Sequence, residues 1–224
     1  MDRFLVFFAD PMCSWCYGFG PELDAFVLAH PGLRLDVVMG GLRAGNREAM
    51  TPAFRDMLAG HWDPVRQESG LAFTPAALER PGFVYDTEPA CRAVVAMRSL
   101  APPKALDYFH RLQSAFYAEG HDITSPAVLA ELAEGLGVDR AAFLAAFGGE
   151  SARTETDLDF STAREMGVSG FPTLAVGYPS KQFFLLASGF TRAAVLSERL
   201  ARIDGIAAGG PVTLPHEASP PGDD

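Results

Sequence analysis

The chain of 224 residues is long enough for one domain with an insertion, or for two closely packed lobes. Hydrophobic residues make up 48% of it and aromatic residues 11%, which suits a globular protein with a sizeable core. Its 28 acidic and 18 basic residues give a net charge of −10, which argues against nucleic acid or an anionic membrane as a partner.

The sequence also bears on the compartment. The first residues do not resemble a secretory leader, and no stretch approaches the roughly 18 uncharged apolar residues of a membrane span. Three cysteines in so long a chain fit a reducing compartment without a disulfide framework. We therefore expect a cytoplasmic protein with no membrane partner, in which a closely spaced cysteine pair is catalytic rather than structural.

The first region predicts a strand, a helix and a second strand. The apolar run over 3–9 does not alternate, which indicates a fully buried strand. A helix follows over about 13–30, and because Pro21 lacks an N–H and clashes with the preceding turn, this helix should kink, or stop at 18–20 and restart. With a second strand over 33–39, these elements predict a right-handed βαβ unit with parallel strands.

The middle region shows helical periodicity and predicts an all-helical insertion domain over 46–149. In three places a hydroxyl residue followed by proline gives the pattern of a helix N-cap and first turn, at Thr51-Pro52, Thr74-Pro75 and Ser125-Pro126. Asp139 is expected to cap a further helix, after Gly137 ends the one before it.

The third region predicts a helix, two paired strands and a final helix. The helix covers about 150–166, and the strands over 173–176 and 182–187 can pair as a hairpin. Thr191 is expected to cap the last helix. The Pro- and Gly-rich tail over 208–224 is predicted to be disordered.

Cys13-Ser14-Trp15-Cys16 stands at the start of the first predicted helix. The thiolate is the nucleophilic form of cysteine, and a helix N-terminus stabilises it through unpaired N–H groups and the helix dipole. A second cysteine one helical turn later can attack a mixed disulfide on the first, so thiol–disulfide exchange is the first hypothesis. Half of a zinc site is the alternative. It needs two more ligands, and only the lone Cys91 and five histidines without an H-x3-5-H pair remain.

Two runs carry a resemblance to a known family. They are D-P-x-C-x-W-C-Y at 10–17 and G-V-x-G-x-P-T at 167–173, one in each half of a chain that a helical insertion divides. With these runs the chain resembles the DsbA-like branch of the thioredoxin superfamily. Within the insertion, His61-Trp62 and 86–92 are similar to the corresponding stretches of its FrnE-like cytoplasmic members. The resemblance extends over about 3–205.

The resemblance implies an α/β fold, the thioredoxin fold, in which a βαβ half and a ββα half surround a central mixed sheet. Residues 1–45 and 150–207 would form this thioredoxin-like domain, with the large all-helical insertion between them. Cys13 would be the exposed nucleophile and Cys16 the buried resolving cysteine. Pro172 would follow a cis peptide bond and lie against the cysteine pair, leaving the Phe171 backbone to pair with an extended peptide or with glutathione.

The neighbours of the cysteines suggest further roles. Ser14 and Trp15 bring no charge between the cysteines, so we expect a reduction potential more reducing than the roughly −120 mV of a strong periplasmic oxidase. Trp15 is expected to rim a substrate groove. His61-Trp62 could hang from the insertion over the cysteines, as substrate-binding residues or in proton transfer, and the alternative is a helix-end histidine with no role. Asp10 either accepts the Cys16 proton or is a plain turn residue before Pro11, and the Asp-Pro pair favours the turn.

Together these patterns predict a thiol–disulfide oxidoreductase that acts on disulfide- or thiol-containing proteins, peptides or glutathione. No metal and no bound cofactor is expected, with glutathione as the one candidate co-substrate, and a homodimer is compatible with the apolar faces of the insertion. A first alternative is a glutathione-dependent transferase or isomerase of the kappa-class type, although these relatives have serine in place of the first cysteine. The second is a non-catalytic chaperone or binding module, for which Cys13→Ser would have no effect.

Overall fold

The computed structural model describes residues 3–179 and 182–207 of the chain, so the tail predicted as disordered lies outside the described residues. A mixed sheet of four strands, in the order β2-β1-β3-β4, forms its centre. The strands are β1 (Phe4–Ala9), β2 (Arg34–Met39), β3 (Thr173–Gly177) and β4 (Phe183–Ser188). β1 and β2 are parallel, whereas β3 runs antiparallel to both β1 and β4.

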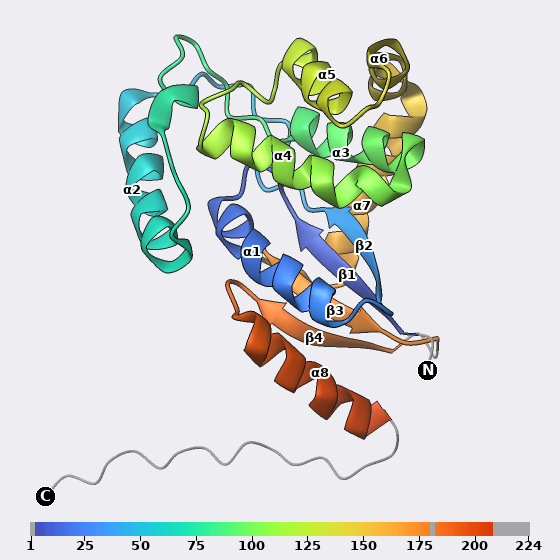
Figure 1. Ribbon diagram of the computed structural model, residues 1–224. Coiled ribbons are helices and arrows are strands. Elements are labelled where there is room, and N and C mark those ends of the chain that lie inside the picture. Colours follow the sequence, from blue (N-terminus) through green and yellow to red (C-terminus); the bar gives the residue numbers. More distant parts are fainter. Residues whose placement is uncertain (1–2, 180–181, 208–224) are drawn as a thin grey trace, which may run out of the picture.

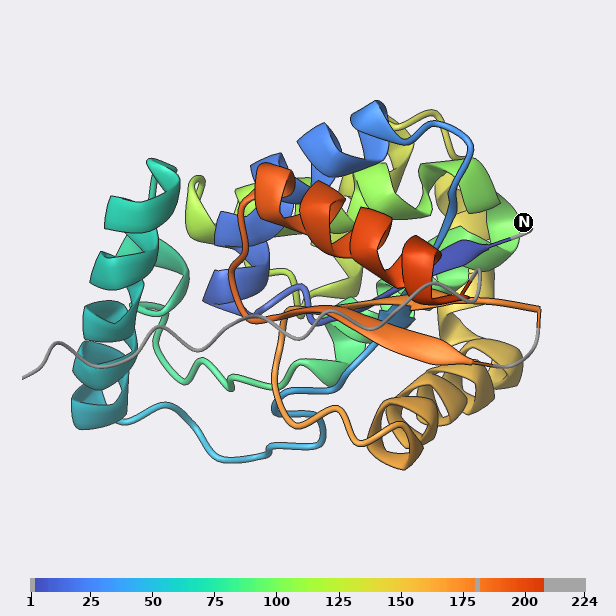
Figure 2. The same ribbon diagram turned by 90° about the horizontal axis from the view of Figure 1, so that it is seen from below.

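Helices cover both faces of this sheet. α1 (Ser14–Ala29) and α8 (Ala193–Ala207) lie on one face, and α7 (Glu150–Glu165) lies on the other (Figure 2). Between β2 and α7 the chain forms α2 (Pro52–Ser69), α3 (Glu88–Leu100), α4 (Ala105–Tyr117), α5 (Pro126–Gly135) and α6 (Arg140–Gly148), with short 3-10 helices at Pro75–Ala77 and Pro102–Lys104. Figure 1 shows α3 to α6 gathered beyond one end of the sheet, and α2 standing at the side. The expected thioredoxin fold with an all-helical insertion is confirmed.

The central strand β1 is buried on both faces, as its unbroken apolar run predicts. Leu5 and Phe7 point into the large core that α1 and the inserted helices share, and both are fully buried. Val6 and Phe8 point to the opposite face and pack with Ala163 of α7. Residues that alternate in direction therefore meet apolar partners on either side of the sheet.

α1 runs without interruption from Ser14 to Ala29 and contains Pro21 in its interior. Of the two expected alternatives, a kink or a stop at 18–20 with a restart, the stop and restart is therefore wrong. The glycines before the proline serve close packing. A Cβ at Gly18 would lie 2.6 Å from Val65 Cγ1 on α2, and one at Gly20 would lie 3.3 Å from His110 Cε1 on α4. These glycines lie at contacts between helices that are distant in the sequence. From the local sequence alone, the same glycines suggest the end of a helix.

The predicted helix starts are partly confirmed. Thr51 and Asp139 each accept a backbone N–H at the start of a helix, whereas Ser125 occupies an N-cap position without a side-chain hydrogen bond. Thr74 precedes only a three-residue 3-10 helix. The expected Thr191 cap is wrong: the Thr191 hydroxyl donates to the Gly189 carbonyl, and the first N–H of α8, that of Ala193, donates to Glu22 of α1 at 2.8 Å.

One ion pair ties the inserted helices to the sheet. Arg98 of α3 makes a bidentate pair with Asp159 of α7, with N–O distances of 2.9 and 3.0 Å. The same guanidinium donates to the Val37 carbonyl of β2, and Asp159 accepts the Met39 N–H. Three elements thus share one polar network near the parallel edge of the sheet.

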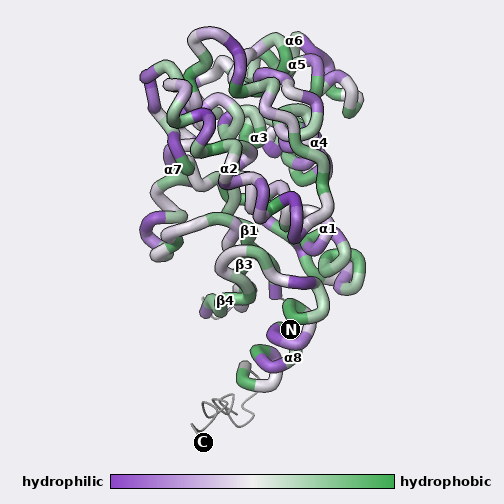
Figure 3. The backbone as a smooth tube through the Cα atoms, turned by 90° about the vertical axis from the view of Figure 1, so that its left-hand side faces the viewer, coloured by the Kyte–Doolittle hydropathy of each residue, from purple (hydrophilic) through white to green (hydrophobic). Residues whose placement is uncertain are grey.

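α8 has the hydropathy expected of a helix with one face on the sheet. Hydrophilic and hydrophobic segments alternate along it in Figure 3, and its buried residues Leu196, Leu200 and Ile203 share one side. Over residues 3–179 and 182–207, no helix combines the length and the apolar character that crossing a membrane requires.

Candidate active site

Cys13 lies at the N-terminus of α1, just beyond the end of β1. The chain turns there through a hydrogen bond from the Cys13 N–H to the Asp10 carbonyl, at 3.0 Å. Cys13 is the N-cap residue, no side chain caps the helix, and its first turn holds no acidic residue. The N–H groups of that turn and the positive end of the helix dipole are therefore available to stabilise a Cys13 thiolate.

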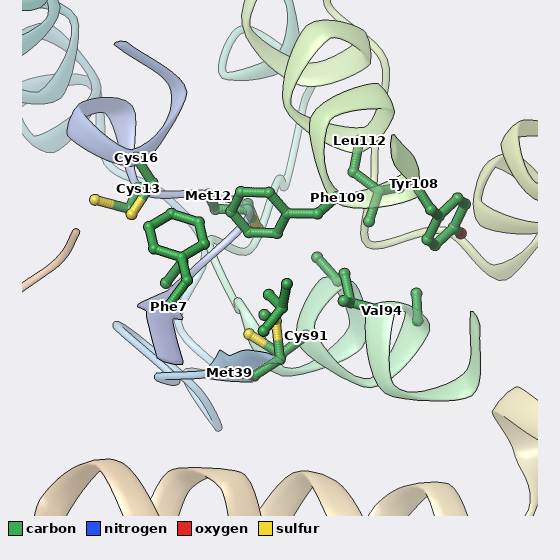
Figure 4. Close-up of a cluster of buried hydrophobic side chains, with 14 of the residues drawn as sticks. Phe7, Met12, Cys13, Cys16, Met39, Cys91, Val94, Tyr108, Phe109 and Leu112 are labelled. Atoms are coloured by element: carbon green, nitrogen blue, oxygen red, sulfur yellow. The ribbon is translucent and has the colours of Figure 1, made fainter. Parts of the chain in front are cut away.

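The two cysteines of the pair differ in access. Cys13 is 6% exposed and Cys16 is fully buried, and both are free thiols (Figure 4). Cys13 is thus less open than the exposed nucleophile that the resemblance implies. Burial raises the pKa of the Cys16 thiol well above its usual value, and a hydrogen bond with Cys13 raises it further. The partner cysteine is therefore protonated at neutral pH and needs a proton acceptor before it can attack.

The loop before β3 lies against this pair. The peptide bond between Phe171 and Pro172 is cis. The Cys13 thiol donates to the Phe171 carbonyl oxygen, with 3.5 Å between sulfur and oxygen. Because Thr173 pairs with Phe8, the pairing of β3 with β1 places this loop beside the turn that carries Cys13.

A groove of about 510 Å³ opens over Cys13. One wall comes from α2, which contributes Leu58, His61 and Pro64, and Phe171 closes another side. Five of the residues predicted for the site line this groove: Cys13, Ser14, Trp15, His61 and Phe171. The groove is mainly apolar, which suits the aliphatic part of a peptide-like substrate.

The structure does not support a substrate contact for Trp62. Its side chain is 1% exposed and packs in the hydrophobic core against the rings of Phe73, Phe116 and Tyr117. Consecutive residues of a helix point in directions about 100° apart, so His61 and Trp62 cannot both face the groove. Pro172 is likewise buried and does not line the groove. Its cis peptide bond lies within the loop that presents Phe171.

Asp10 is fully buried, and its contacts fit the turn role that the sequence left as one of two alternatives. Its carboxylate accepts the Met12 N–H at 2.8 Å within the turn, and it also accepts the Leu42 N–H at 2.7 Å and the Cys91 thiol at 3.4 Å. Burial raises the pKa of this carboxyl above its ordinary value, and the hydrogen bonds act in the opposite direction. The Asp10 charge also raises the pKa of the Cys16 thiol.

Cys91 lies on α3 and is fully buried, in agreement with its expected place on an apolar helix face. Figure 4 shows it beside Met39, apart from Cys13 and Cys16. Burial raises the pKa of this thiol well above its usual value, and the nearby Asp10 raises it further. As a protonated thiol without access to the groove, Cys91 is a poor nucleophile.

Sequence reasoning missed Tyr85 and Leu42, which both line the groove. The Tyr85 hydroxyl donates a short hydrogen bond to the Met12 carbonyl, directly before the reactive cysteine. Tyr85 immediately precedes the 86–92 stretch that the resemblance singles out. Leu42 follows the carboxyl end of β2, beside the end of β1, where the loops of parallel strands meet. The positions of Tyr85 and Leu42 were thus visible in the sequence, but a tyrosine and a leucine have no reactive group that would identify them as site residues.

Comparison with known proteins bears on this site. The model of the DSBA-like thioredoxin domain family matches residues 4–201. A candidate protein disulfide isomerase from Nitrosomonas europaea is 32% identical and superposes with a TM-score of 0.85, over 94% of this chain and all of that one. The cytosolic disulfide reductase DsbM from Pseudomonas aeruginosa is 26% identical, with a TM-score of 0.74 over 89% of this chain and 98% of that one, and it has also been solved with glutathione.

A curated relative is more distant. The ClpXP adapter protein SpxH of Bacillus subtilis is 24% identical over 174 residues, which cover 76% of this chain and 56% of that protein. This chain thus spans little more than half the length of SpxH. The family match covers most of the present chain, including the cysteine pair and the loop before β3. The chain therefore belongs to the DSBA-like thioredoxin domain family.

Proposed function

We propose that the protein is a thiol–disulfide oxidoreductase in which Cys13 attacks a substrate disulfide. The Cys13 thiolate forms a mixed disulfide with one sulfur of the substrate, and the other sulfur leaves as a thiolate. Cys16 then attacks the Cys13 sulfur, which releases the second substrate thiolate and leaves a Cys13–Cys16 disulfide. The substrate has been reduced by two electrons and the protein oxidised by two. Two equivalents of an external thiol, or one dithiol, restore the pair by the reverse exchange, and the same chemistry run backwards oxidises a dithiol substrate.

Asp10 is the proton acceptor that we assign to the second step. The Cys16 thiol must lose its proton before it attacks, and its pKa is raised by burial. Asp10 is buried within electrostatic range of Cys16, and burial raises the pKa of its own carboxyl, which makes it a stronger base than an exposed carboxylate. The proton passes from the thiol to this carboxylate as the new disulfide forms.

The observation that carries the proposal is the position of the Cys13 thiol. It lies at an uncapped helix N-terminus, at the base of a groove, and donates to the carbonyl oxygen of Phe171. An extended backbone beside Phe171 would bring a substrate sulfur to Cys13. Because a disulfide reductase of the same family has been solved with glutathione, we include glutathione as a co-substrate. The cytosolic assignment of that reductase also supports a cytoplasmic setting.

Trapping the mixed disulfide tests this mechanism. The Cys16→Ser variant has lost the resolving thiol, so incubation with glutathione disulfide should add one glutathione to Cys13, visible by intact-mass spectrometry and removable by dithiothreitol. Cys13→Ser should add none, because burial keeps Cys16 protonated and without access to the groove. Cys91→Ser is the matched control and should behave as the wild type.

Two results would contradict the proposal. Equal labelling of the Cys13→Ser and Cys16→Ser variants would show that Cys13 is not the nucleophile. If glutathione disulfide left the Cys16→Ser variant unmodified while thiol reagents labelled Cys13, the site would not exchange disulfides. The fold would then serve a transferase, an isomerase or a binding module.

A further inference from the structure

A second hollow of about 220 Å³ lies beside the groove over Cys13. The ring of Tyr85 lines both. Leu42 borders the groove and its neighbour Arg43 borders the hollow, while Leu58 and Phe54 do the same one helical turn apart on α2. The segment from β2 to α2, light blue in Figure 2, crosses the space between the sheet and α2, and it contains Arg43. A substrate in the groove can thus extend toward Arg43.

Arg43 is held in a defined position. Its guanidinium carbon lies 4.5 Å from the centre of the Phe54 ring, as in a cation–π contact. Its backbone N–H donates to the Thr87 hydroxyl at 3.2 Å, and the preceding Leu42 N–H donates to Asp10 at 2.7 Å. The buried carboxylate below the cysteine pair therefore also anchors the segment that presents the arginine.

Within residues 3–179 and 182–207, Arg43 has no ion-pair partner, because no carboxylate there lies within 4 Å of its guanidinium. Glu48 lines the same hollow without pairing with it. Burial raises the pKa of the Tyr85 hydroxyl. The charges of Asp10 and Cys13 raise this pKa further, whereas the Arg43 charge lowers it, so Cys13 and Arg43 both lie close enough to Tyr85 to change its pKa.

We propose that Arg43 is a specificity-determining residue that binds a carboxylate of the disulfide compound attacked by Cys13. This inference rests on the proposed function and narrows its substrates to small peptide disulfides with a carboxylate beyond the reacting sulfur. The planar guanidinium of Arg43 donates N–H groups to that carboxylate. The apolar groove binds the part of the substrate between the carboxylate and the sulfur, and Cys13 reacts with the sulfur. In a chain with a net charge of −10, such a cation beside the site offsets the repulsion of an anionic substrate.

Single-turnover kinetics with two probes test the inference. Reduced protein is mixed with glutathione disulfide or with its fully ethyl-esterified form, which has the same bonds but no free carboxylate, and loss of protein thiols is followed by acid quench and mass spectrometry. Arg43→Gln should slow the reaction with glutathione disulfide about five- to tenfold, as expected for loss of an exposed charge-assisted contact. It should leave the rate with the ester unchanged, and Arg43→Lys should recover part of the loss.

Arg47→Gln is the matched control, because it removes the same charge four residues away, from a side chain outside both hollows. It should leave both rates close to those of the wild type. Equal slowing by Arg43→Gln and Arg47→Gln would reduce the effect to net charge, and equal slowing with both probes would make Arg43 a structural residue. Either result, or unchanged rates in Arg43→Gln, overturns the inference. Failure of the wild-type protein to react with either probe would instead remove the proposed function, and this inference with it.

Discussion

At the scale of single residues, the structure gives Asp10 a clear pH signature. Burial raises the pKa of its carboxyl above the ordinary value of 3.8, which the unfolded chain retains. As the pH rises above 3.8, the unfolded chain loses this proton more readily than the folded protein does. The contribution of the carboxyl to stability is therefore complete below 3.8 and is lost as the pH rises through the raised folded pKa.

We accordingly expect the stability of the wild type, relative to Asp10→Asn, to fall as the pH rises above 3.8. Asparagine has the same size and cannot ionise, although its amide also faces backbone donors, which costs about 1–3 kcal/mol at every pH. Urea unfolding at a series of pH values measures the difference. Asp36→Asn, at a side chain that is 42% exposed, is the control. A difference between the wild type and Asp10→Asn that stays constant across the series would contradict the raised pKa.

Residue chemistry was predictable from the sequence where it depends on local pattern. Cys13 and Cys16 carry a spacing that has few other uses, and the structure places them at a helix start with Phe171 beside them. The side on which His61 and Trp62 point depends instead on how α2 is rotated against α1. That rotation is fixed by contacts between distant helices, so the sequence pattern could not show that only His61 reaches the groove.

At the scale of elements, α2 is the helix on which the shape of the groove depends. It supplies one wall of the groove and the Phe54 ring under Arg43. It packs on α1 at Gly18, where a Cβ would lie 2.6 Å from Val65 Cγ1. A side chain there would force Val65, and with it the contact between the two helices, to shift.

Gly18→Ala should therefore destabilise the fold by about 1–3 kcal/mol and slow the reaction with glutathione disulfide, because the groove wall is displaced. Urea unfolding and the single-turnover assay measure the two effects. Gly205→Ala in α8 is the matched control: nothing lies within 4 Å of its added Cβ, so the usual gain of about 0.5–1 kcal/mol is expected. If Gly18→Ala were as stable and as active as Gly205→Ala, the close packing of α1 on α2 would not be important.

Elements themselves were largely predictable, because apolar periodicity and capping residues are local signals. The strands, the hairpin and the start of α2 at Thr51 follow the expectations closely. The stop and restart, one of the two alternatives expected around Pro21, did not occur, and the expected Thr191 cap of α8 was also wrong. There the cap comes from Glu22 of α1, a partner that is 171 residues away in the sequence.

At the scale of the whole molecule, the inserted helices and the sheet form one framework around the cysteine pair. Arg98 and Asp159 join α3, α7 and β2, and the core of the inserted helices continues into that of the sheet. Such a framework fixes the positions of Cys13, the loop at Phe171 and the groove wall at α2 relative to one another. The arrangement of these parts was foreseen only through the resemblance to a family, since no local pattern encodes which helix closes the groove.

The reduction potential of the Cys13–Cys16 pair tests the central claim most directly. The protein is equilibrated in glutathione redox buffers, quenched with acid, alkylated and analysed by mass spectrometry. We predict one two-electron transition that forms a Cys13–Cys16 disulfide while Cys91 stays free. Because Ser14 and Trp15 bring no charge to the thiolate, its potential should lie well below the roughly −120 mV of a strong oxidase. A potential near −120 mV, or no disulfide between Cys13 and Cys16 in any buffer, would contradict the account.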